Sequence, residues 1–389
     1  MFPLAHRMEL FTEHFFVGLS VRLAALRAQG YDVIRLDEGS PDLPPAPHII
    51  EALSRAAERP DTHNYQPQRG IPELRQAWAE MYKRVYGVTL DPEREILTLI
   101  GSKEGIVHLP LAFINPGDVV LVLDPGYITY TRGARLAGGE PYYIPLLPER
   151  GFLPDLQAVP PEILDRAKIL WLNYPNNPTA AIASLNFFSE AVAFTRQHHL
   201  ILCHDSAYSQ VTFDGCRAPS LLELSGAKDV CVEFNTLSKS HNMASWRVAA
   251  LIGNVAAIQA MYTLKTNLDS GQFCPVMEAA VAAMKSDQAW MQARNEIYRQ
   301  RRDVVIQTLQ RLGLRAETPR ASLYVWFAIP PGQTSVDFAA TMLERAHVSL
   351  TPGSIFGSDG EGYIRLSLTA PIEQIEKAIQ HLEKHFLNM

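Results

Sequence analysis

The sequence predicts an α/β fold with a mostly parallel sheet, followed by a smaller α+β region. Between residues 95 and 253, short apolar runs alternate with helical stretches, and several runs are apolar throughout rather than at every second position. Such runs are typical of parallel strands that helices cover on both faces. The 389 residues are too many for one ordinary core and enough for two domains.

The first elements follow from local spacing. Apolar residues recur on one helical face over about residues 14–29, and Gly30 ends the pattern. The stretch DVIRLDEGSPDLPPAP predicts a short strand and a Gly/Pro-rich loop, and Pro72 marks the first turn of a helix over 72–86. The runs that we expect to form the sheet are 95–100, 119–124, 168–173, 200–205, 230–235 and 248–253.

The last hundred or so residues have a different pattern. We expect a charged helix over 290–312, a helix near 335–346 and an amphipathic helix over 371–386, with the strand-like runs SLYVWFAIP, VSLTPG and YIRLSLT among them. This alternation predicts a small α+β domain. No linker is rich enough in Gly, Ser or charge to indicate independent modules.

Composition excludes several classes of partner. The formal net charge of −6 gives no reason to expect nucleic acid or an anionic membrane. Four cysteines are scattered without a CxxC pair, which is typical of reduced thiols in a cytosolic protein. The N-terminus has no apolar signal region, and no apolar stretch reaches the ~18 residues of a membrane helix. We therefore expect a cytoplasmic protein.

The most informative stretch is Leu237-Ser238-Lys239-Ser240, with Arg247 eight residues after the lysine. Most lysines are solvated surface residues. A lysine whose pKa is lowered by burial and by a neighbouring cation forms imines well. The adjacent serine and the arginine are suited to bind a phosphate. The stretch predicts a Schiff-base lysine beside a phosphate, which is the arrangement of a pyridoxal-phosphate (PLP) site.

Two other stretches follow expected strands. Gly101-Ser102-Lys103-Glu104-Gly105 opens a helix, where backbone N–H groups bind phosphate. Alone, it is also typical of a plain strand-to-helix turn. The stretch NYPNNPT, residues 173–179, lies where α/β folds place ligands, although Asn and Pro also make ordinary loops. An Asn amide there could donate to a phenolic oxygen.

The stretch His204-Asp205-Ser206-Ala207-Tyr208 ends another strand. An Asp at this point is often a helix N-cap. A fixed carboxylate would also keep a pyridinium nitrogen protonated, and Tyr208 could hydrogen-bond the cofactor's phenolate. The neighbouring cluster of His198, His199, Cys203 and His204 is not expected to bind a metal. Alternation along a strand points these side chains to opposite faces.

Together these stretches resemble the class I/II aminotransferases, the fold-type-I PLP enzymes. Seven motifs occur in the family's order: NYQPQRG, GSKEG, DPGY, NNPT, HDSAY, SLSKSHNMASWR and RLS. The stretches IGSKEGIVHLPLAFINPGDVVLVLDPGY, LNYPNNPT and TNLDSGQF look most like the LL-diaminopimelate aminotransferase branch. The resemblance implies a mostly parallel seven-stranded sheet in a large domain over 46–288. It also implies a small domain over 289–389, to which the N-terminal arm, 1–45, contributes.

The resemblance also implies a role for each matching residue. Lys239 would form the imine with PLP and move the substrate proton, and Asp205 would pair with the pyridinium nitrogen. The implied phosphate ligands are Ser102, Lys103, Ser238 and Arg247, with Tyr127 stacked on the ring and Tyr208 and Asn177 at its phenolic oxygen. Tyr65 would reach the phosphate of the neighbouring subunit in a homodimer. For the substrate, Arg365 would clamp the α-carboxylate beside Asn177, and Gly39 would let its loop close.

The sequence departs from the family pattern at three glycines. Alanine replaces the usual glycine at Ala180 and Ala249, and serine replaces it at Ser245. Alanine tolerates only negative φ comfortably, so the turn at Ala180 is expected to differ, and Ser245 adds a hydroxyl near the phosphate arginine. These departures affect loop geometry and membership of the diaminopimelate branch, and they remove no catalytic group.

The expected function is amino-group transfer from an amino acid to a 2-oxoacid such as 2-oxoglutarate, with LL-diaminopimelate as the leading donor. A general aminotransferase for alanine, aspartate or aromatic donors is the first alternative. A PLP-dependent carbon–sulfur β-lyase would keep Lys239, Asp205 and Arg365 and is the second. A non-catalytic regulator is disfavoured, because only about 30 residues precede the GSPD strand and loop.

Overall fold

The computed structural model describes residues 2–11 and 15–386. Its large sheet has seven strands in the order β2-β8-β7-β6-β5-β3-β4. Only β8 pairs antiparallel with its neighbours, and the remaining pairings are parallel. The strands of this sheet are β2 (Ile96–Ile100), β3 (Val119–Asp124), β4 (Glu140–Pro145), β5 (Ala167–Asn173), β6 (Ile201–Asp205), β7 (Cys231–Thr236) and β8 (Val248–Gly253). This is the expected mostly parallel sheet.

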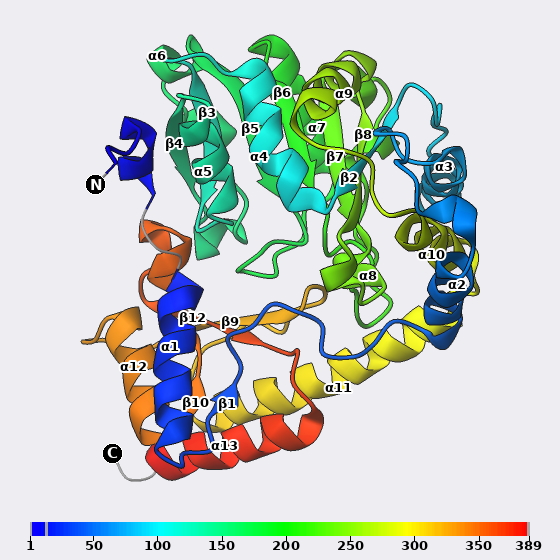
Figure 1. Cartoon of the computed structure of the whole chain (residues 1–389). Coiled ribbons are helices and arrows are strands. Elements are labelled where there is room, and N and C mark those ends of the chain that lie inside the picture. Colours follow the sequence, from blue (N-terminus) through cyan, green and yellow to red (C-terminus); the bar gives the residue numbers. More distant parts are fainter. Residues whose placement is uncertain (1, 12–14, 387–389) are drawn as a thin grey trace.

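Helices cover both faces of the large sheet, as the continuous apolar strands predict (Figure 1). The helices of this part are α2 (Pro47–Ala57), α3 (Pro72–Tyr86), α4 (Ser102–Phe113), α5 (Thr129–Leu136), α6 (Pro161–Leu164), α7 (Leu185–Gln197), α8 (Leu237–Ser240), α9 (Val255–Leu268) and α10 (Cys274–Lys285). β3 and β7 are buried along their whole length, which explains why their sequences do not alternate.

The smaller part lies below the large sheet in Figure 1 and contains two small sheets. β1 (Ile34–Arg35) pairs in parallel with β10 (Val348–Ser349), and β12 (Tyr363–Ser367) pairs antiparallel with both β9 (Tyr324–Ala328) and β11 (Thr351–Pro352). The helices here are α1 (Phe15–Ala28), α11 (Ala289–Arg311), α12 (Ser335–Arg345) and α13 (Ile372–Phe386). The architecture is the α/β sheet plus small α+β part that the sequence predicts.

The small part has its own hydrophobic core. Ile34 and Leu36 from the N-terminal segment pack with Tyr324, Ile364 and other residues of the small sheets. A separate core surrounds the large sheet. The N-terminal segment therefore packs with the C-terminal part. The division at 45/46 and 288/289 remains a prediction.

The predicted element bounds differ from the structure by one or two residues at several ends, and one strand was missed. β4 has the sequence EPYYIP, in which Pro141 and Pro145 are poor strand residues. The strand forms because it is an edge strand that pairs only with β3. Proline is tolerated at an edge, where a missing N–H faces away from the sheet.

Candidate active site

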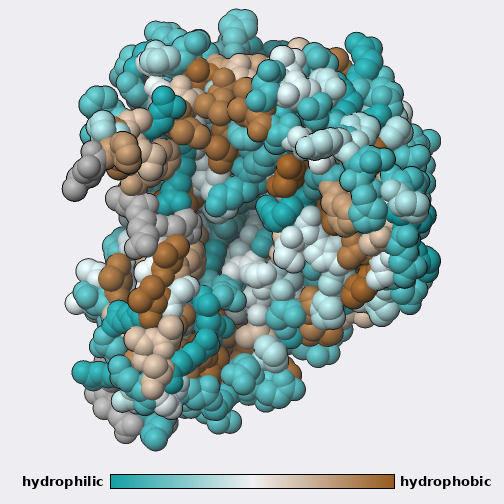
Figure 2. Space-filling model, in the orientation of Figure 1, coloured by the Kyte–Doolittle hydropathy of each residue, from teal (hydrophilic) through white to brown (hydrophobic). Residues whose placement is uncertain are grey.

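The predicted site residues meet where the large sheet faces the small part. Lys239 lies on α8, directly after β7, and Asp205 is the last residue of β6. Arg365 comes from β12 of the small part. Figure 2 shows a deep hollow on this face of the molecule, between its upper and lower parts. The site is therefore built between two parts of the chain, which explains why its members are far apart in sequence.

Lys239 is held in a partly buried, electropositive setting. Its Nζ donates to the Gly39 carbonyl at 2.5 Å. Burial lowers the pKa of Lys239, and the charges of Arg365 and Arg247 act in the same direction, whereas Tyr324 opposes them. A lower pKa increases the neutral amine fraction, which is the nucleophilic form. The setting therefore suits an amine that attacks a carbonyl carbon.

Asp205 is a buried carboxylate with one free oxygen. Its Oδ2 accepts a hydrogen bond from the Tyr130 hydroxyl at 2.8 Å. Its Oδ1 is buried and has no hydrogen-bond partner of good geometry among the described residues, although the nearby Ala207 N–H also lowers the pKa of this carboxyl. Burial raises the pKa of Asp205, and the Tyr130 hydrogen bond is the largest opposing effect. An unpaired buried carboxylate oxygen is costly, so a donor from a bound group would relieve it.

Arg365 is fixed in a position suited to a carboxylate. Its Nη1 donates to Asn177 Oδ1 and its Nη2 to the Asp37 carbonyl, each at 2.9 Å. The guanidinium carbon lies 4.2 Å from the ring centre of Tyr324 and 4.8 Å from that of Phe356. The side chain is buried, although no carboxylate pairs with it among the described residues. A buried guanidinium with only neutral acceptors is a ready binding group for an anion.

The segments expected to hold a phosphate also lie together. Gly101 precedes the first turn of α4 with φ of +74°, and a Cβ on it would lie 2.0 Å from Arg247 Nη2. Glycine is therefore required for this close approach. Burial, Arg132 and Arg247 all lower the pKa of Lys103. Ser102 is the first residue of α4, so its N–H belongs to the helix N-terminus.

The remaining predicted residues have clear positions. The Tyr208 hydroxyl lies 2.9 Å from the Tyr324 hydroxyl, and Ser238 Oγ accepts from Thr236 Oγ1 at 3.0 Å. Tyr127 lies next to Tyr130, with ring centres 5.7 Å apart. Tyr65 is the exception, because it is 93% exposed and forms no hydrogen bond or ion pair with these groups among the described residues.

Ala180 has a left-handed backbone. Its φ is +61°, a conformation that glycine adopts without strain and that costs alanine about 1 kcal/mol. Ser245 is exposed, and Ala249 is fully buried in β8. The first departure therefore costs stability and leaves Asn177 in hydrogen-bond contact with Arg365.

Sequence reasoning missed four residues of the site. Tyr130 bonds Asp205, Tyr324 bonds Tyr208 and packs against the Arg365 guanidinium, and Phe356 also lies against that guanidinium. Arg132 adds charge near Lys103. Tyr130 had a weak signal, because it follows Tyr127 by one helical turn. Tyr324 and Phe356 had none, since their positions depend on how the small part docks.

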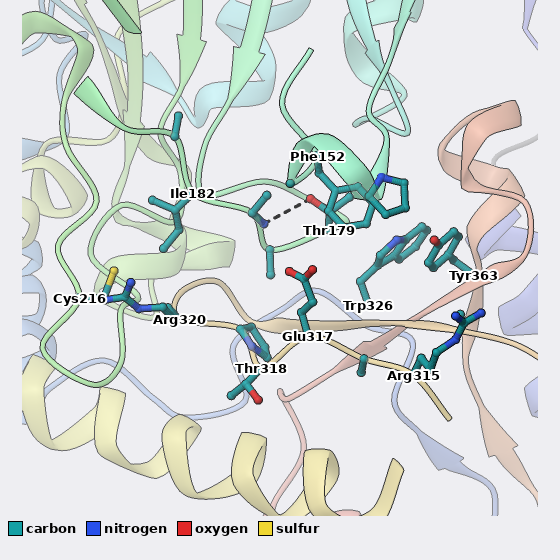
Figure 3. A pocket seen from close by; sticks show the side chains of 18 of the residues that line it. Phe152, Thr179, Ile182, Cys216, Arg315, Glu317, Thr318, Arg320, Trp326 and Tyr363 are labelled. Atoms are coloured by element: carbon teal, nitrogen blue, oxygen red, sulfur yellow. Dashed lines mark hydrogen bonds between the residues drawn. The ribbon is translucent and has the colours of Figure 1, made fainter. Parts of the chain in front are cut away.

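A cavity of about 1320 Å³ lies beside the site (Figure 3). Thr179, Trp326 and Tyr363 are among the residues that line it, whereas Lys239, Asp205 and Arg365 are not. Arg315, Glu317 and Arg320 line its lower side in Figure 3. The cavity borders the loop that carries Asn177 but is separate from the groups described above.

Comparisons with known proteins agree with this geometry. The family model "Aminotransferase class I and II" matches residues 31–382. The LL-diaminopimelate aminotransferase of Desulforudis audaxviator is 48% identical over 378 residues, which cover 97% of this chain and 96% of that protein. Two solved structures are also similar. Apo-BacF from Bacillus subtilis has a TM-score of 0.96 at 38% identity, covering 100% of this chain and 99% of that one. A single mutant of Thermus thermophilus aspartate aminotransferase has a TM-score of 0.92 at 30% identity, covering 99% and 100%.

The chain therefore belongs to the class I and II aminotransferases, and its fold is the fold type I of that family. It is an enzyme that transfers amino groups. No helix among the described residues is long and apolar enough to cross a membrane.

Proposed function

We propose that this aminotransferase holds PLP at Lys239 and transfers an amino group from LL-diaminopimelate to a 2-oxoacid such as 2-oxoglutarate. The observation that supports the cofactor most directly is the buried Asp205 Oδ1 without a partner. A protonated pyridine nitrogen supplies the donor that this oxygen lacks. When bound, PLP acts as an electron sink for the substrate's Cα–H bond.

The residues fit the rest of this cofactor. Lys239 is the amine for covalent attachment to the aldehyde and the base that moves the substrate proton, because its pKa is lowered by burial. Asn177 and Tyr208 would hydrogen-bond the phenolic oxygen, and Tyr127 would pack against the ring. We assign the phosphate to the N-terminus of α4, with Ser102 and Lys103, and to Ser238 and Arg247.

Arg365 would bind the substrate α-carboxylate, since it is a buried guanidinium without an anionic partner among the described residues. Gly39 lets its loop lie against Tyr324, because a Cβ there would be 2.3 Å from the Tyr324 hydroxyl. The loop carbonyl is also the acceptor for Lys239. Binding of a carboxylate at Arg365 and release of Lys239 therefore involve the same loop.

We also propose a homodimer in which Tyr65 reaches the phosphate site of the neighbouring subunit. Tyr65 is 93% exposed, although tyrosine is a residue that usually packs at least in part. Its loop is held to the body, since a Cβ on Gly271 would lie 2.3 Å from the Gln66 carbonyl oxygen. A cytoplasmic setting is proposed as well, supported by four cysteines that are all free.

The choice of donor is supported by the relatives named LL-diaminopimelate aminotransferase, at 43–48% identity. The similar aspartate aminotransferase structure supports the alternative, a general aminotransferase, less strongly at 30% identity. A panel of donors with 2-oxoglutarate separates the two. We expect glutamate to form from LL-diaminopimelate faster than from aspartate, alanine or phenylalanine. Turnover of another donor with none from LL-diaminopimelate refutes the assignment, and pyruvate released from a cysteine conjugate without any oxoacid indicates a lyase.

The cofactor proposal has its own test. Apoprotein is mixed with PLP, reduced with borohydride and digested, and the modified peptide is located by mass spectrometry. We expect the adduct on Lys239 and its absence in Lys239→Ala. An adduct on a different lysine, or on none, contradicts the proposal. Lys103→Ala is the matched control, because Lys103 is another lysine at the site with a lowered pKa, although its side chain is exposed.

A further inference from the structure

A buried histidine–glutamate pair lies behind Asp205, on the opposite face of β6. His204 and Glu233 occupy paired positions on β6 and β7, and neither side chain has exposed surface. His204 Nδ1 lies 2.9 Å from Glu233 Oε2. Because side chains alternate along a strand, His204 points away from the side that Asp205 faces. The proposed chemistry uses neither residue of this pair.

The contacts of Glu233 place the negative charge on its carboxylate. The Tyr82 hydroxyl donates to Oε1 at 2.6 Å, and Ser220 Oγ donates at 3.0 Å. The Leu221 N–H donates to Oε2 at 3.1 Å. Several donors around one carboxyl group favour its ionised form. The proton between Glu233 and His204 therefore belongs to the imidazole ring.

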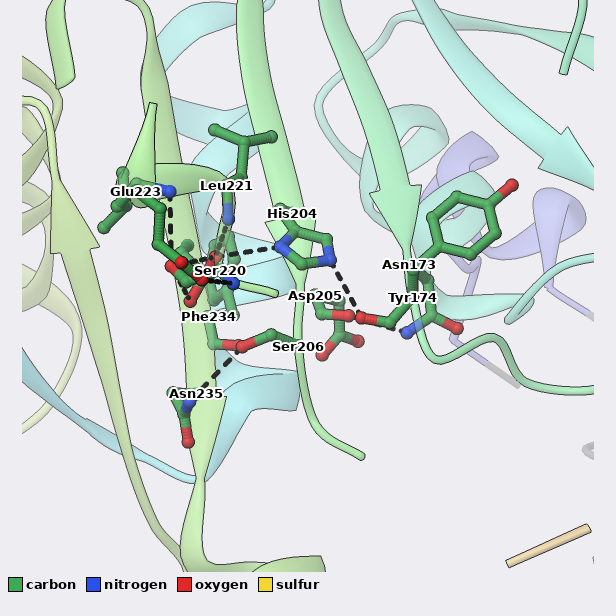
Figure 4. Close-up of polar contacts among 12 residues, drawn as sticks. Asn173, Tyr174, His204, Asp205, Ser206, Ser220, Leu221, Glu223, Phe234 and Asn235 are labelled. Carbon is green, nitrogen blue, oxygen red and sulfur yellow. Dashed lines mark hydrogen bonds and ion pairs between the residues drawn. The ribbon is translucent and has the colours of Figure 1, made fainter. Parts of the chain in front are cut away.

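The second nitrogen of His204 also faces an acceptor. His204 Nε2 lies 3.0 Å from the carbonyl oxygen of Tyr174, which can only accept a hydrogen bond. Figure 4 shows the ring between the cluster around Ser220 on one side and Tyr174 on the other. A neutral ring would leave one nitrogen lone pair facing an oxygen lone pair. Both nitrogens donate, so His204 is an imidazolium.

We infer that the His204 imidazolium is a positioning residue, which keeps Asp205 ionised and anchors the loop that carries Asn177. The inference rests on the proposed function, because the ionised Asp205 is the partner of the cofactor's ring nitrogen. His204 is the cation in hydrogen-bond contact with Glu233 among the described residues. The other titratable groups that face Glu233 are Tyr82 and Tyr86 from α3 and Cys231 from its own strand.

The positive charge of His204 acts on Asp205, which we call its electrostatic role. Burial raises the pKa of Asp205, and the Tyr130 hydrogen bond and then the charge of His204 are the largest effects that oppose it. Lys239 lowers the same pKa, but its contribution ranks below that of His204. The charge of Lys239 would also not stay constant, because Lys239 would bond to the cofactor and move the substrate proton. The positive charge behind the strand stays in place throughout.

The His204 ring also anchors the loop after β5, which we call its mechanical role. Asn173 Nδ2 donates to the Asp205 carbonyl at 2.7 Å, and the Asn177 N–H donates to Asn173 Oδ1 at 2.8 Å. The Tyr174 carbonyl between them is the acceptor for His204. Because the His204 ring also contacts Glu233, it connects the loop after β5 to β7 as well as to β6. The Asn177 side chain in turn accepts from Arg365.

Two substitutions of His204 separate its electrostatic role at Asp205 from its mechanical role at the loop after β5. In His204→Gln the amide reaches where Nε2 lies, so the bond to Tyr174 is kept and the charge is lost. In His204→Asn the amide reaches only where Nδ1 lies, so both the charge and the loop contact are lost. Apoprotein is titrated with PLP and with the analogue that has carbon in place of the ring nitrogen. We expect the wild-type protein to bind PLP more tightly than the analogue. In both variants the ratio of the two dissociation constants should fall about tenfold.

Hydrogen exchange on the apoproteins tests the loop. Peptides over residues 173–180 are expected to exchange faster in His204→Asn and at the wild-type rate in His204→Gln. Phe188→Leu is the matched control, since its ring lies 4.8 Å from the His204 ring and carries no charge. It should keep the preference for PLP. If His204→Gln does not fold, the double variant His204→Gln/Glu233→Gln replaces the ion pair with an amide pair and gives the same comparison.

The outcomes distinguish the proposals. A His204→Gln protein that binds PLP with the full wild-type preference refutes the electrostatic role, as does an equal loss in Phe188→Leu. Unchanged exchange in His204→Asn refutes the mechanical role. Failure of wild type to bind PLP refutes the proposed function instead, and the exchange experiment still tests the anchoring of the loop.

Discussion

Removing the Tyr130 hydroxyl gives the most direct measurement of charge at Asp205. Tyr130 is 1% exposed and donates to Asp205 Oδ2 at 2.8 Å. In Tyr130→Phe the second carboxylate oxygen loses its partner as well, because Oδ1 already has none among the described residues. A hydrogen bond to a charged group contributes about 1.5–3 kcal/mol, so we expect the apoprotein to lose about 2 kcal/mol of unfolding free energy at neutral pH.

Tyr174→Phe is a matched control for this prediction. Tyr174 is also 1% exposed, and its hydroxyl donates at 2.8 Å to the neutral carbonyl of Phe152. The distance and burial are therefore the same, and only the charge of the acceptor differs. A neutral hydrogen bond contributes about 1 kcal/mol, so the loss in Tyr174→Phe should be about half as large and independent of pH.

The pH dependence gives the sign of the effect. The folded-state pKa of Asp205 is raised, so the stability associated with its protonated form is present below the unfolded pKa and is lost as the pH rises through the folded pKa. Tyr130→Phe raises that folded pKa further. Its deficit relative to wild type should therefore grow between pH 5 and pH 7.5.

The assay is urea denaturation of both variants and wild type at one fixed protein concentration, at these two pH values. Equal losses in Tyr130→Phe and Tyr174→Phe, with no dependence on pH, would show that Asp205 is not an ionised acceptor for Tyr130.

Three further predictions concern backbone strain, anion recognition and close packing. Ala180→Gly should raise the unfolding free energy by about 1 kcal/mol, because φ at this residue is +61°, whereas Ala181→Gly should lower it; thermal denaturation measures both. Arg365→Lys should raise the KM for amino donors about tenfold or more. One ammonium group cannot contact both Asn177 and the Asp37 carbonyl and also bind a carboxylate bidentately. An unchanged KM in steady-state kinetics would contradict this. Gly39→Ala should cost about 1–3 kcal/mol of stability, because the new Cβ would lie 2.3 Å from the Tyr324 hydroxyl, and the double variant Gly39→Ala/Tyr324→Phe should recover part of that loss in the same denaturation assay.

The strands of the large sheet could be predicted because strands that are buried on both faces have continuous apolar sequences. β3 and β8 have the predicted bounds, since strands covered on both faces need apolar residues at every position. β4 could not be found in the same way. Its two prolines and its exposed residues are allowed only because it pairs on one side, and which strand lies at the edge is a property of the whole sheet.

The site shows the same contrast. Lys239, Asp205 and Arg365 were predicted from short motifs, and the structure brings them to one region. Tyr130 and Tyr324 were not predicted, because aromatic residues with their spacing are usually core residues. Their hydroxyls acquire a role only when Asp205 and Tyr208 are brought to 2.8 and 2.9 Å from them.

The sequence by itself determined the class of fold, the family and the residues with reactive groups, because strand burial and short motifs are local properties of the chain. Only the tertiary structure decided which of those groups are charged, paired or left free. Those states depend on burial and on neighbours that come from distant segments, such as Glu233 beside His204 and Asp37 beside Arg365.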